Sequence, residues 1–201
     1  MRLGRIKALE ILNGQSLIER TVDCLYSLSH SVLVITSQEQ FEVIAASRLR
    51  GKVIVDLCPG RGALGGIYTA LASADSCYSL VVGCDMPFLN RNLLRYLIGL
   101  APGFDLVVPR VDGMYEPLHA VYSQSCLAPV TKLMEQNNLG ISNLFDIVNT
   151  RYVDKDEIVK FDSQFLSFFN VNTLYDLRKA KEIMKQREHS FMAGKEYPNC
   201  D

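Results

Sequence analysis

The feature that most constrains the fold is a short apolar run that ends in a carboxylate, Leu80–Phe88. Residues 80–83 are apolar or small, which is typical of a strand buried on both faces. Asp85 follows at the carboxyl end, and Pro87 prevents the strand from continuing. Because ligands of open α/β sheets bind just outside the carboxyl ends of strands, Asp85 is a candidate ligand of a divalent cation that holds phosphate. An ordinary polar turn explains the same residue types.

Strand-like runs alternate with helical patterns, which predicts an α/β fold of the Rossmann-like three-layer α/β/α kind. The sheet is expected to be mostly parallel, with one antiparallel strand. Strands are predicted over 31–35, 53–55, 80–83, 105–109, 116–122 and 151–153. Helices are predicted over 16–28, 41–50, 90–100, 127–136, 142–148 and 173–187, with a further one that follows a glycine-rich segment and ends near Ala74. We expect a single domain over 1–188 and a disordered tail over 189–201.

Composition excludes several classes of protein. The 201 residues are 48% hydrophobic and 21% charged, as in an ordinary globular domain. The net charge of -1 predicts no general attraction to nucleic acid or to an anionic membrane. No apolar run reaches the ~18 residues of a membrane span, and the basic amino terminus lacks the apolar core of a secretory signal. The six scattered cysteines indicate reduced thiols and a cytoplasmic protein.

The glycine-rich segment Pro59–Gly66 leads into an apolar helix. Glycines allow backbone to approach a ligand closely, and a helix amino terminus favours an anion. The segment matches neither the Walker pattern nor Gly-x-Gly-x-x-Gly, so a flexible turn is the competing interpretation. Polar residues at the ends of the predicted strands are expected to line one edge of the sheet; these are Thr36, Asp56, Asp85 and Arg110.

Five segments of the chain occur in the order found in nucleotidyltransferases; they are 2–8, 12–20, 62–66, 84–88 and 170–173. The chain most closely resembles the molybdenum cofactor guanylyltransferases, from Met1 to about Lys185. Residues 116–122 also look like the segment of that family on the second-substrate side. The resemblance implies a fold of the nucleotide-diphospho-sugar transferase type.

One departure from the family concerns the amino terminus. Family members begin with a strand and an Ala-Gly-Gly loop, and this chain matches only from the arginine that follows that loop, Arg2. In such folds the first strand is central and its loop cradles the nucleotide through backbone N–H groups. We therefore expect a gap in the sheet or a rearranged pairing. Our hypothesis is that the natural start lies upstream, or that the product is impaired.

The resemblance implies transfer of GMP from GTP to molybdopterin with release of pyrophosphate, dependent on Mg²⁺, in the cytoplasm. GTP and molybdopterin would be the substrates, and on family grounds a protein that delivers molybdopterin would be a partner. The base would be recognised mainly by the missing loop. A cytidylyltransferase acting on molybdopterin or on a sugar or polyol phosphate therefore remains an alternative, as does a non-catalytic nucleotide-binding protein.

The resemblance also assigns roles to residues. Lys7 would contact the nucleotide and balance phosphate charge, and Asp85 would hold Mg²⁺. Thr36 and Asp56 would contact the nucleotide. Candidate contacts to phosphate or to the second substrate are Arg2, Arg61, Asn170 and Asn172. The competing interpretations are a solvated lysine, a solvated arginine, and strand-end or helix caps. His119 is expected to be a packed residue, and Cys84 a small buried filler.

Overall fold

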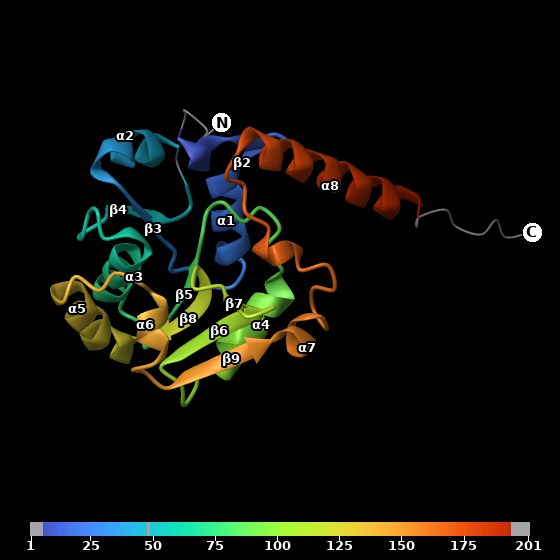
Figure 1. Ribbon diagram of the computed structural model, residues 1–201. Helices are drawn as coiled ribbons and strands as arrows, with labels where there is room; N and C mark the ends of the chain where they lie inside the picture. Colours follow the sequence, from blue (N-terminus) through green and yellow to red (C-terminus); the bar gives the residue numbers. More distant parts are fainter. Residues whose placement is uncertain (1–5, 48, 194–201) are drawn as a thin grey trace, which may run out of the picture.

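The computed structural model describes residues 6–47 and 49–193, and the side chains of 6–47 and 49–187 (Figure 1). Its strands are β1 (Ile11–Leu12), β2 (Gln15–Ser16), β3 (Leu33–Thr36), β4 (Lys52–Val55), β5 (Tyr78–Val82), β6 (Leu106–Val111), β7 (Met114–Tyr115), β8 (His119–Ser123) and β9 (Thr150–Asp154). Its α-helices are α1 (Leu17–Tyr26), α2 (Gln38–Ala46), α3 (Gly62–Ser73), α4 (Arg91–Leu100), α5 (Leu127–Glu135), α6 (Ser142–Phe145), α7 (Lys155–Ile158) and α8 (Leu174–Ala193). Short 3₁₀ turns are η1 (Lys7–Leu9), η2 (Gln124–Cys126) and η3 (Leu166–Phe168).

The largest sheet has five strands in the order β5-β8-β6-β7, with β9 paired to β6. β8 runs antiparallel to both β5 and β6, whereas β9 runs parallel to β6. The α/β fold class is confirmed, and β8 is the antiparallel strand that the sequence predicts. β7 adds a second antiparallel element, a two-residue hairpin partner of β6 across the turn at Asp112 and Gly113, both with positive φ.

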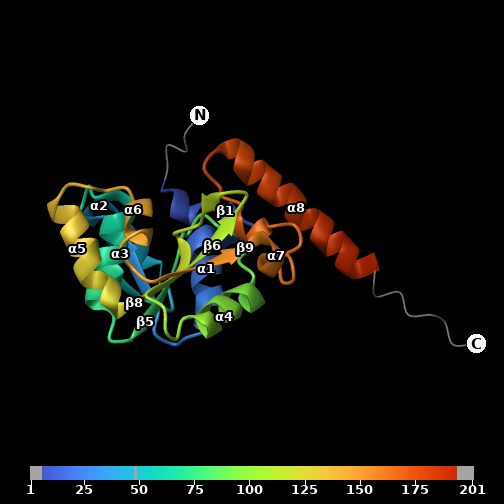
Figure 2. The same cartoon turned by 60° about the horizontal axis from the view of Figure 1, so that its bottom comes forward.

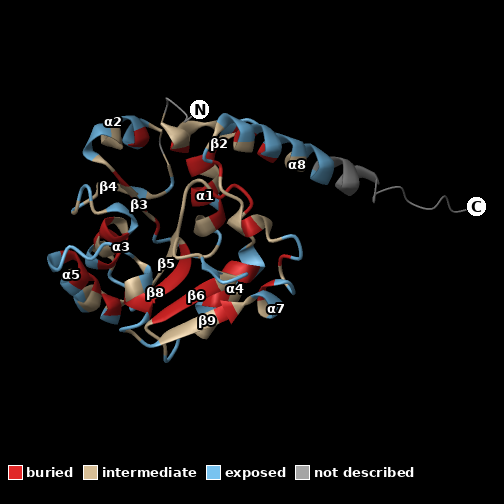
Figure 3. Cartoon of the chain, viewed as in Figure 1, coloured by how far each residue is buried: buried red, intermediate tan, exposed pale blue. Residues whose placement is uncertain are grey.

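Helices cover the five-stranded sheet on two faces, which gives three layers (Figure 2). Alternate residues of β6 show this arrangement. Leu106 and Val108 pack in one cluster with α3, α5 and α6, whereas Val107 packs in another with α4 and α7. These side chains are buried, as a period of two along a covered strand requires. The strongly buried core therefore lies along β6 and β8 (Figure 3).

β3 and β4 form a separate parallel pair, in register from Leu33 opposite Lys52 to Thr36 opposite Val55. Within the described residues, no ladder joins this pair to β5. α3 packs against both β3 and β5, so one helix layer serves both sheets. Of the gap and the rearranged pairing that the sequence leaves open, the described strands show the gap.

Several local predictions are confirmed and others are wrong. The predicted capping box at the start of α1 is present, because the Ser16 hydroxyl accepts from the Glu19 amide and Glu19 accepts from the Ser16 amide. The strand predicted over 116–122 is wrong at its start, since β8 begins only at His119. The amide of His119 donates to the carbonyl of Glu116 in a turn that contains Pro117.

The helix ends also differ from the predictions. α2 lies over Gln38–Ala46, earlier than predicted, and α3 begins inside the glycine-rich segment at Gly62. α8 continues to Ala193, past the predicted end near Arg187, and its carboxyl-terminal part extends away from the body of the molecule (Figure 1). Of the helices described, none is both long enough and apolar enough to cross a bilayer.

His119, at the start of β8, is completely buried, and its ring packs edge-on against Phe168. The prediction of a packed residue is confirmed. Neither ring nitrogen has a hydrogen-bond partner in the described part of the chain. Burial lowers the pKa of His119 to about 4 from an ordinary value of 6.5, and the Asp162 carboxylate offsets part of this effect.

We predict that this histidine makes the fold less stable as the pH falls from about 6.5 to about 4. In that window the unfolded chain binds a proton that the folded chain does not. The stabilising contribution of the neutral histidine is therefore fully present above about pH 6.5. Between about pH 6.5 and 4 the free energy of unfolding falls by up to about 1.4 kcal/mol per pH unit. Urea unfolding at pH 7 and pH 5 should show that the free energy of unfolding decreases less between these pH values in His119→Leu than in the natural chain. His30→Gln, which changes an exposed histidine, is the control. An equal decrease of the free energy of unfolding in His119→Leu and in the natural chain would show that His119 is not its source.

Candidate active site

Three side chains from distant parts of the chain meet beyond the carboxyl end of β5. The Lys7 ammonium nitrogen lies 2.6 Å from Asp85 Oδ2 and donates to it. The same nitrogen donates to Asn172 Oδ1, also at 2.6 Å. The Lys7 and Asp85 side chains are only 29% and 23% exposed, so the pair is largely but not fully withdrawn from water. Three of the residues that the sequence singles out therefore form one cluster.

Local structure positions each member of this cluster. Lys7 begins η1, where its carbonyl accepts from the Glu10 amide at 3.1 Å. Asp85 follows β5 and its backbone carbonyl accepts from the Val171 amide at 2.8 Å, which joins the loop after β5 to the segment before α8. Val171 is fully buried, and this anchors the backbone next to Asn172, the residue that follows it.

Asn172 is held from the other side by the first turn of α8. Its amide donates to Asp176 Oδ2 at 3.0 Å, and the Thr173 amide donates to the same oxygen at 2.8 Å. The Thr173 hydroxyl in turn accepts from the Asp176 amide, as the predicted cap requires. The backbone of Asn172 therefore acts within the cap, while its side chain is used for Lys7.

The absence of a side chain at Gly83 leaves space for the Asp85 carboxylate. A Cβ at position 83 would lie 2.5 Å from Asp85 Oδ1, closer than real Cβ contacts allow. Any larger residue would therefore displace the carboxylate. Sequence reasoning treated this glycine only as a small strand residue. The spacing Gly-x-Asp at a strand end was the signal that it missed.

Glu116 is a second residue whose position sequence reasoning did not find. The β5–β8 ladder pairs Val82 with His119, and the Gly83 amide donates to the Leu118 carbonyl at 2.9 Å. This register brings the turn before β8 alongside the end of β5. Burial, and then the negative charge of Asp85, raise the pKa of Glu116. Only the strand register brings these two carboxyl groups near each other.

Thr36 ends β3, and Asp56, which directly follows β4, lies beside it. The Asp56 amide donates to the Thr36 carbonyl at 2.8 Å, and Thr36 is almost completely buried. Asp56 Oδ1 accepts from the Cys58 amide at 3.0 Å and from the Thr69 hydroxyl at 2.7 Å. Asp56 thus ties the glycine-rich segment to α3, which is the turn-capping alternative that the sequence left open.

The other candidate contacts have partners outside the Lys7 cluster. Arg61 Nη1 donates to Asn137 Oδ1 at 2.7 Å, on the turn after α5. Asn170 Nδ2 donates to the Phe168 carbonyl at 3.1 Å, a local contact. Arg2 lies outside the described residues.

Cys84, next to the aspartate, is not prepared to act as a nucleophile. Burial raises the pKa of its thiol to about 11, and the Asp85 charge acts in the same direction. The thiol is therefore neutral near pH 7. It packs against the apolar cluster formed by α1, α2 and β3, as expected of a filler.

Solved structures share this fold. Molybdopterin-guanine dinucleotide biosynthesis protein A from Archaeoglobus fulgidus superimposes with a TM-score of 0.79 at 31% identity, covering 92% of this chain and 93% of that one. A 4-diphosphocytidyl-2C-methyl-D-erythritol synthase from Anaerococcus prevotii superimposes with a TM-score of 0.68 at 12% identity, over 87% and 88% of the two chains. The architecture is that of nucleotidyltransferases of the nucleotide-diphospho-sugar transferase type.

Sequence comparison gives the family. The chain belongs to the MobA-like NTP transferase domain family, whose pattern matches residues 1–151. It is 33% identical over 180 residues to a probable molybdenum cofactor guanylyltransferase from Pelotomaculum thermopropionicum, covering 90% of this chain and 86% of the relative. It is 30% identical over 183 residues to the molybdenum cofactor guanylyltransferase of Desulfosudis oleivorans, covering 90% and 89%. The resemblance that the sequence motifs indicate is confirmed.

We predict that Asp56 stabilises the fold through its two accepted hydrogen bonds. Asp56→Ala should lower the free energy of unfolding by about 1–3 kcal/mol, because the buried Thr69 hydroxyl and the Cys58 amide lose their acceptor. Asp56→Asn keeps an acceptor oxygen and should lose less. Urea unfolding of the three chains measures the difference. Equal stability of Asp56→Ala and the natural chain would rule out this anchoring role.

Proposed function

We propose that this protein transfers a guanylyl group from GTP to molybdopterin and releases pyrophosphate. Membership of the MobA-like family supports nucleotidyl transfer, and the names of the relatives from two bacteria support this donor and acceptor. The single observation that carries the proposal is the contact of Lys7 with both Asp85 and Asn172 at the sheet edge. An ammonium, a carboxylate and an amide gathered at one point suit a site for phosphate and a divalent cation.

The proposed reaction is a displacement at phosphorus. An oxygen of the terminal phosphate of molybdopterin forms a bond to the α-phosphorus of GTP. The bond from that phosphorus to the bridging oxygen of the β-phosphate breaks, and its electron pair leaves with pyrophosphate. Such a reaction depends on positioning and on neutralising charge, and it needs no covalent nucleophile from the protein.

In this proposal Lys7 is the group that meets the phosphate charge. Its ammonium has three donors, of which Asp85 and Asn172 accept two. The third can be given to a phosphate oxygen without breaking either contact. Asn172 then serves as a positioning residue, because it accepts a second hydrogen bond from the ammonium that Asp85 also contacts.

The donor set at this point fits Mg²⁺. Asp85 Oδ2 and Asn172 Oδ1 are hard oxygen ligands, and both already lie 2.6 Å from one cationic group. The described residues contain no group of three or more His, Cys, Asp or Glu side chains able to hold a metal. Mg²⁺ is commonly held by one or two carboxylates together with substrate phosphates and water. Asp85 would hold it here, and it would withdraw negative charge from the triphosphate oxygens.

The other candidate residues that the structure describes lie outside the Lys7–Asp85–Asn172 cluster. Thr36 and Asp56 end the neighbouring strands β3 and β4, so we keep them as proposed nucleotide contacts. Arg61 and Asn170 would have to leave their present partners to reach a phosphate. Arg2 is kept on the resemblance alone. We also propose a cytoplasmic location and a protein that delivers molybdopterin; the free thiols of the five described cysteines support the first.

We predict that Asp85→Ala and Lys7→Ala each lower pyrophosphate release by about 100-fold or more, since each removes a charged group from the reacting phosphates. Release should require GTP and molybdopterin together, and CTP should not replace GTP. Asp75→Ala, which removes an exposed carboxylate from the segment before β5, is the control. Turnover unaffected by Asp85→Ala would refute the site. A preference for CTP would indicate a cytidylyltransferase, and nucleotide binding without turnover a binding protein.

We further predict that Gly83→Ala impairs turnover nearly as strongly, although it removes no functional group. The added methyl would meet Asp85 Oδ1 at 2.5 Å and displace the carboxylate. Gly99→Ala is the matched control, because a Cβ there has nothing within 4 Å. Steady-state pyrophosphate release and thermal unfolding should be measured on both variants. A fully active Gly83→Ala chain would show that the orientation of the carboxylate is not required.

A further inference from the structure

A cleft lies beside the candidate active site and is lined by other residues. It has a volume of about 870 Å³ and is bounded by α1, α4, α8 and the loop that follows Asp85. Lys7, Asp85 and Asn172 are not among its lining residues. Its volume is that of a small-molecule site and exceeds what one water or one ion needs.

Arginine is the dominant charged residue of this cleft. Four line it, one from α1, two from α4 and one from α8: Arg20, Arg91, Arg95 and Arg187. Among residues 6–47 and 49–187, no ion pair joins any of these guanidinium groups to a carboxylate. Positive charge from three helices therefore lines one hollow without a direct ion pair to any of the four arginines.

The two acidic residues of the cleft are already engaged. Asp23 Oδ2 accepts from Gln15 Nε2 at 2.7 Å. Asp162 is nine-tenths buried, and its Oδ2 accepts from the Ser167 amide at 2.7 Å. Two aspartates against four arginines leave the cleft with an excess of positive charge.

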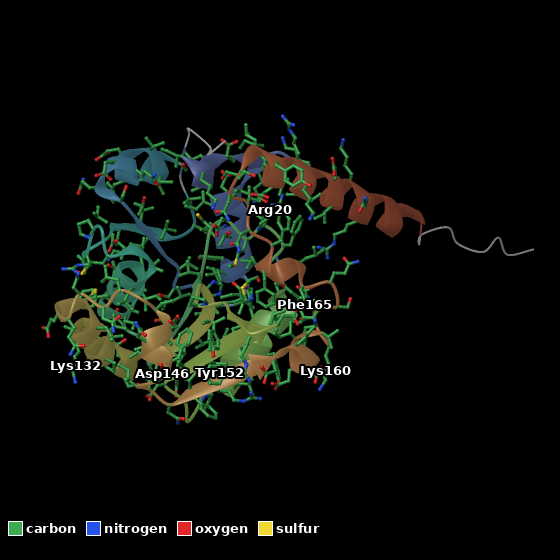
Figure 4. All side chains as sticks on the ribbon, viewed as in Figure 1. Arg20, Lys132, Asp146, Tyr152, Lys160 and Phe165 are labelled. Atoms are coloured by element: carbon green, nitrogen blue, oxygen red, sulfur yellow. The ribbon has the colours of Figure 1, made fainter. Side chains whose placement is uncertain are left out.

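Arg20 shows most clearly that a partner of opposite charge is missing. It lies on α1, below α8 (Figure 4). Its Nη2 donates to the Leu12 carbonyl at 2.9 Å, while its Nε is buried and has no partner in the described part of the chain. Burial lowers the pKa of this guanidinium, so its charge is held in an unfavourable environment. An anion bound in the cleft would supply the opposite charge that this guanidinium lacks.

The amino terminus of α4 adds to the positive electrostatic potential of the cleft. This ten-residue helix has no acidic residue in its first turn, and Arg91 and Asn92 from that turn line the cleft. Asn90 caps the helix through the amides of Asn92 and Leu93. The positive end of the helix dipole therefore faces the hollow together with the arginine side chains.

We propose that this cleft binds a small molecule that carries phosphate groups, at a site separate from the Lys7–Asp85 cluster. Guanidinium groups match phosphate oxygens in geometry and bind them with charge-assisted hydrogen bonds. Met86 and Pro87, directly after Asp85, belong to the wall of the cleft. A ligand there would contact the loop that positions the carboxylate without touching it.

Pyrophosphate is the probe for the test, used without divalent metal and measured by isothermal titration calorimetry. The double variant Arg91→Gln/Arg95→Gln should bind it about tenfold more weakly or worse than the natural chain, because two charge-assisted contacts are lost. Arg178→Gln, an exposed α8 arginine outside the cleft, should bind as the natural chain does. Lys7→Ala should keep the binding.

GDP titrated into the Lys7→Ala chain distinguishes the two sources of phosphate. GDP binding that weakens with the double substitution indicates a nucleotide ligand, and pyrophosphate binding alone indicates an inorganic one. If the double variant does not fold, as judged by circular dichroism, Arg187→Gln replaces it, because that side chain is exposed. Pyrophosphate affinity that the cleft variants leave unchanged, or that Lys7→Ala abolishes, would overturn the proposal.

Discussion

One ammonium group holds the candidate active site together. Lys7 donates to Asp85 and to Asn172, which are 78 and 165 positions away along the chain. The contact joins a 3₁₀ turn at one end of the described residues to the end of β5 and to the cap of α8. Both bonds are charge-assisted and the pair is largely withdrawn from water, so the geometry is more restricted than that of a surface ion pair.

The fold supplies this contact through strand ends and their register. β8 runs antiparallel between β5 and β6, and its pairing with β5 brings the turn at Glu116 beside Asp85. The Val171 amide then ties the segment before α8 to the Asp85 carbonyl. A core along β6 and β8, packed on both faces, keeps these backbone positions in place.

Much of this arrangement could be predicted from sequence. The alternation of apolar runs with helical patterns predicts the α/β class, and the Ser16–Glu19 box predicts the start of α1 correctly. The motifs single out Lys7, Asp85 and Asn172 as candidates, and the structure brings these three side chains together. The extent of the 116–122 strand was not predictable, because apolar alternation there does not reveal the turn that Pro117 permits.

Other features depend on tertiary contacts that no local pattern contains. The roles of Gly83 and Glu116 follow from the direction of one carboxylate and from the β5–β8 register. The arginine-lined cleft draws its residues from three helices, each of which alone resembles an ordinary solvated face. A strand-end aspartate can cap a turn or meet a nucleotide, and no local pattern shows that Asp56 accepts from Cys58 and Thr69.

The central claim is that the Lys7–Asp85–Asn172 cluster receives the triphosphate. The most direct measurement is a crystal structure of the protein with Mg²⁺ and a non-hydrolysable GTP analogue. The account predicts phosphate oxygens within hydrogen-bond distance of the Lys7 ammonium, and the metal on the Asp85 carboxylate. A nucleotide whose phosphates bind elsewhere, with the Lys7–Asp85 contact unchanged and no metal beside it, would contradict the account.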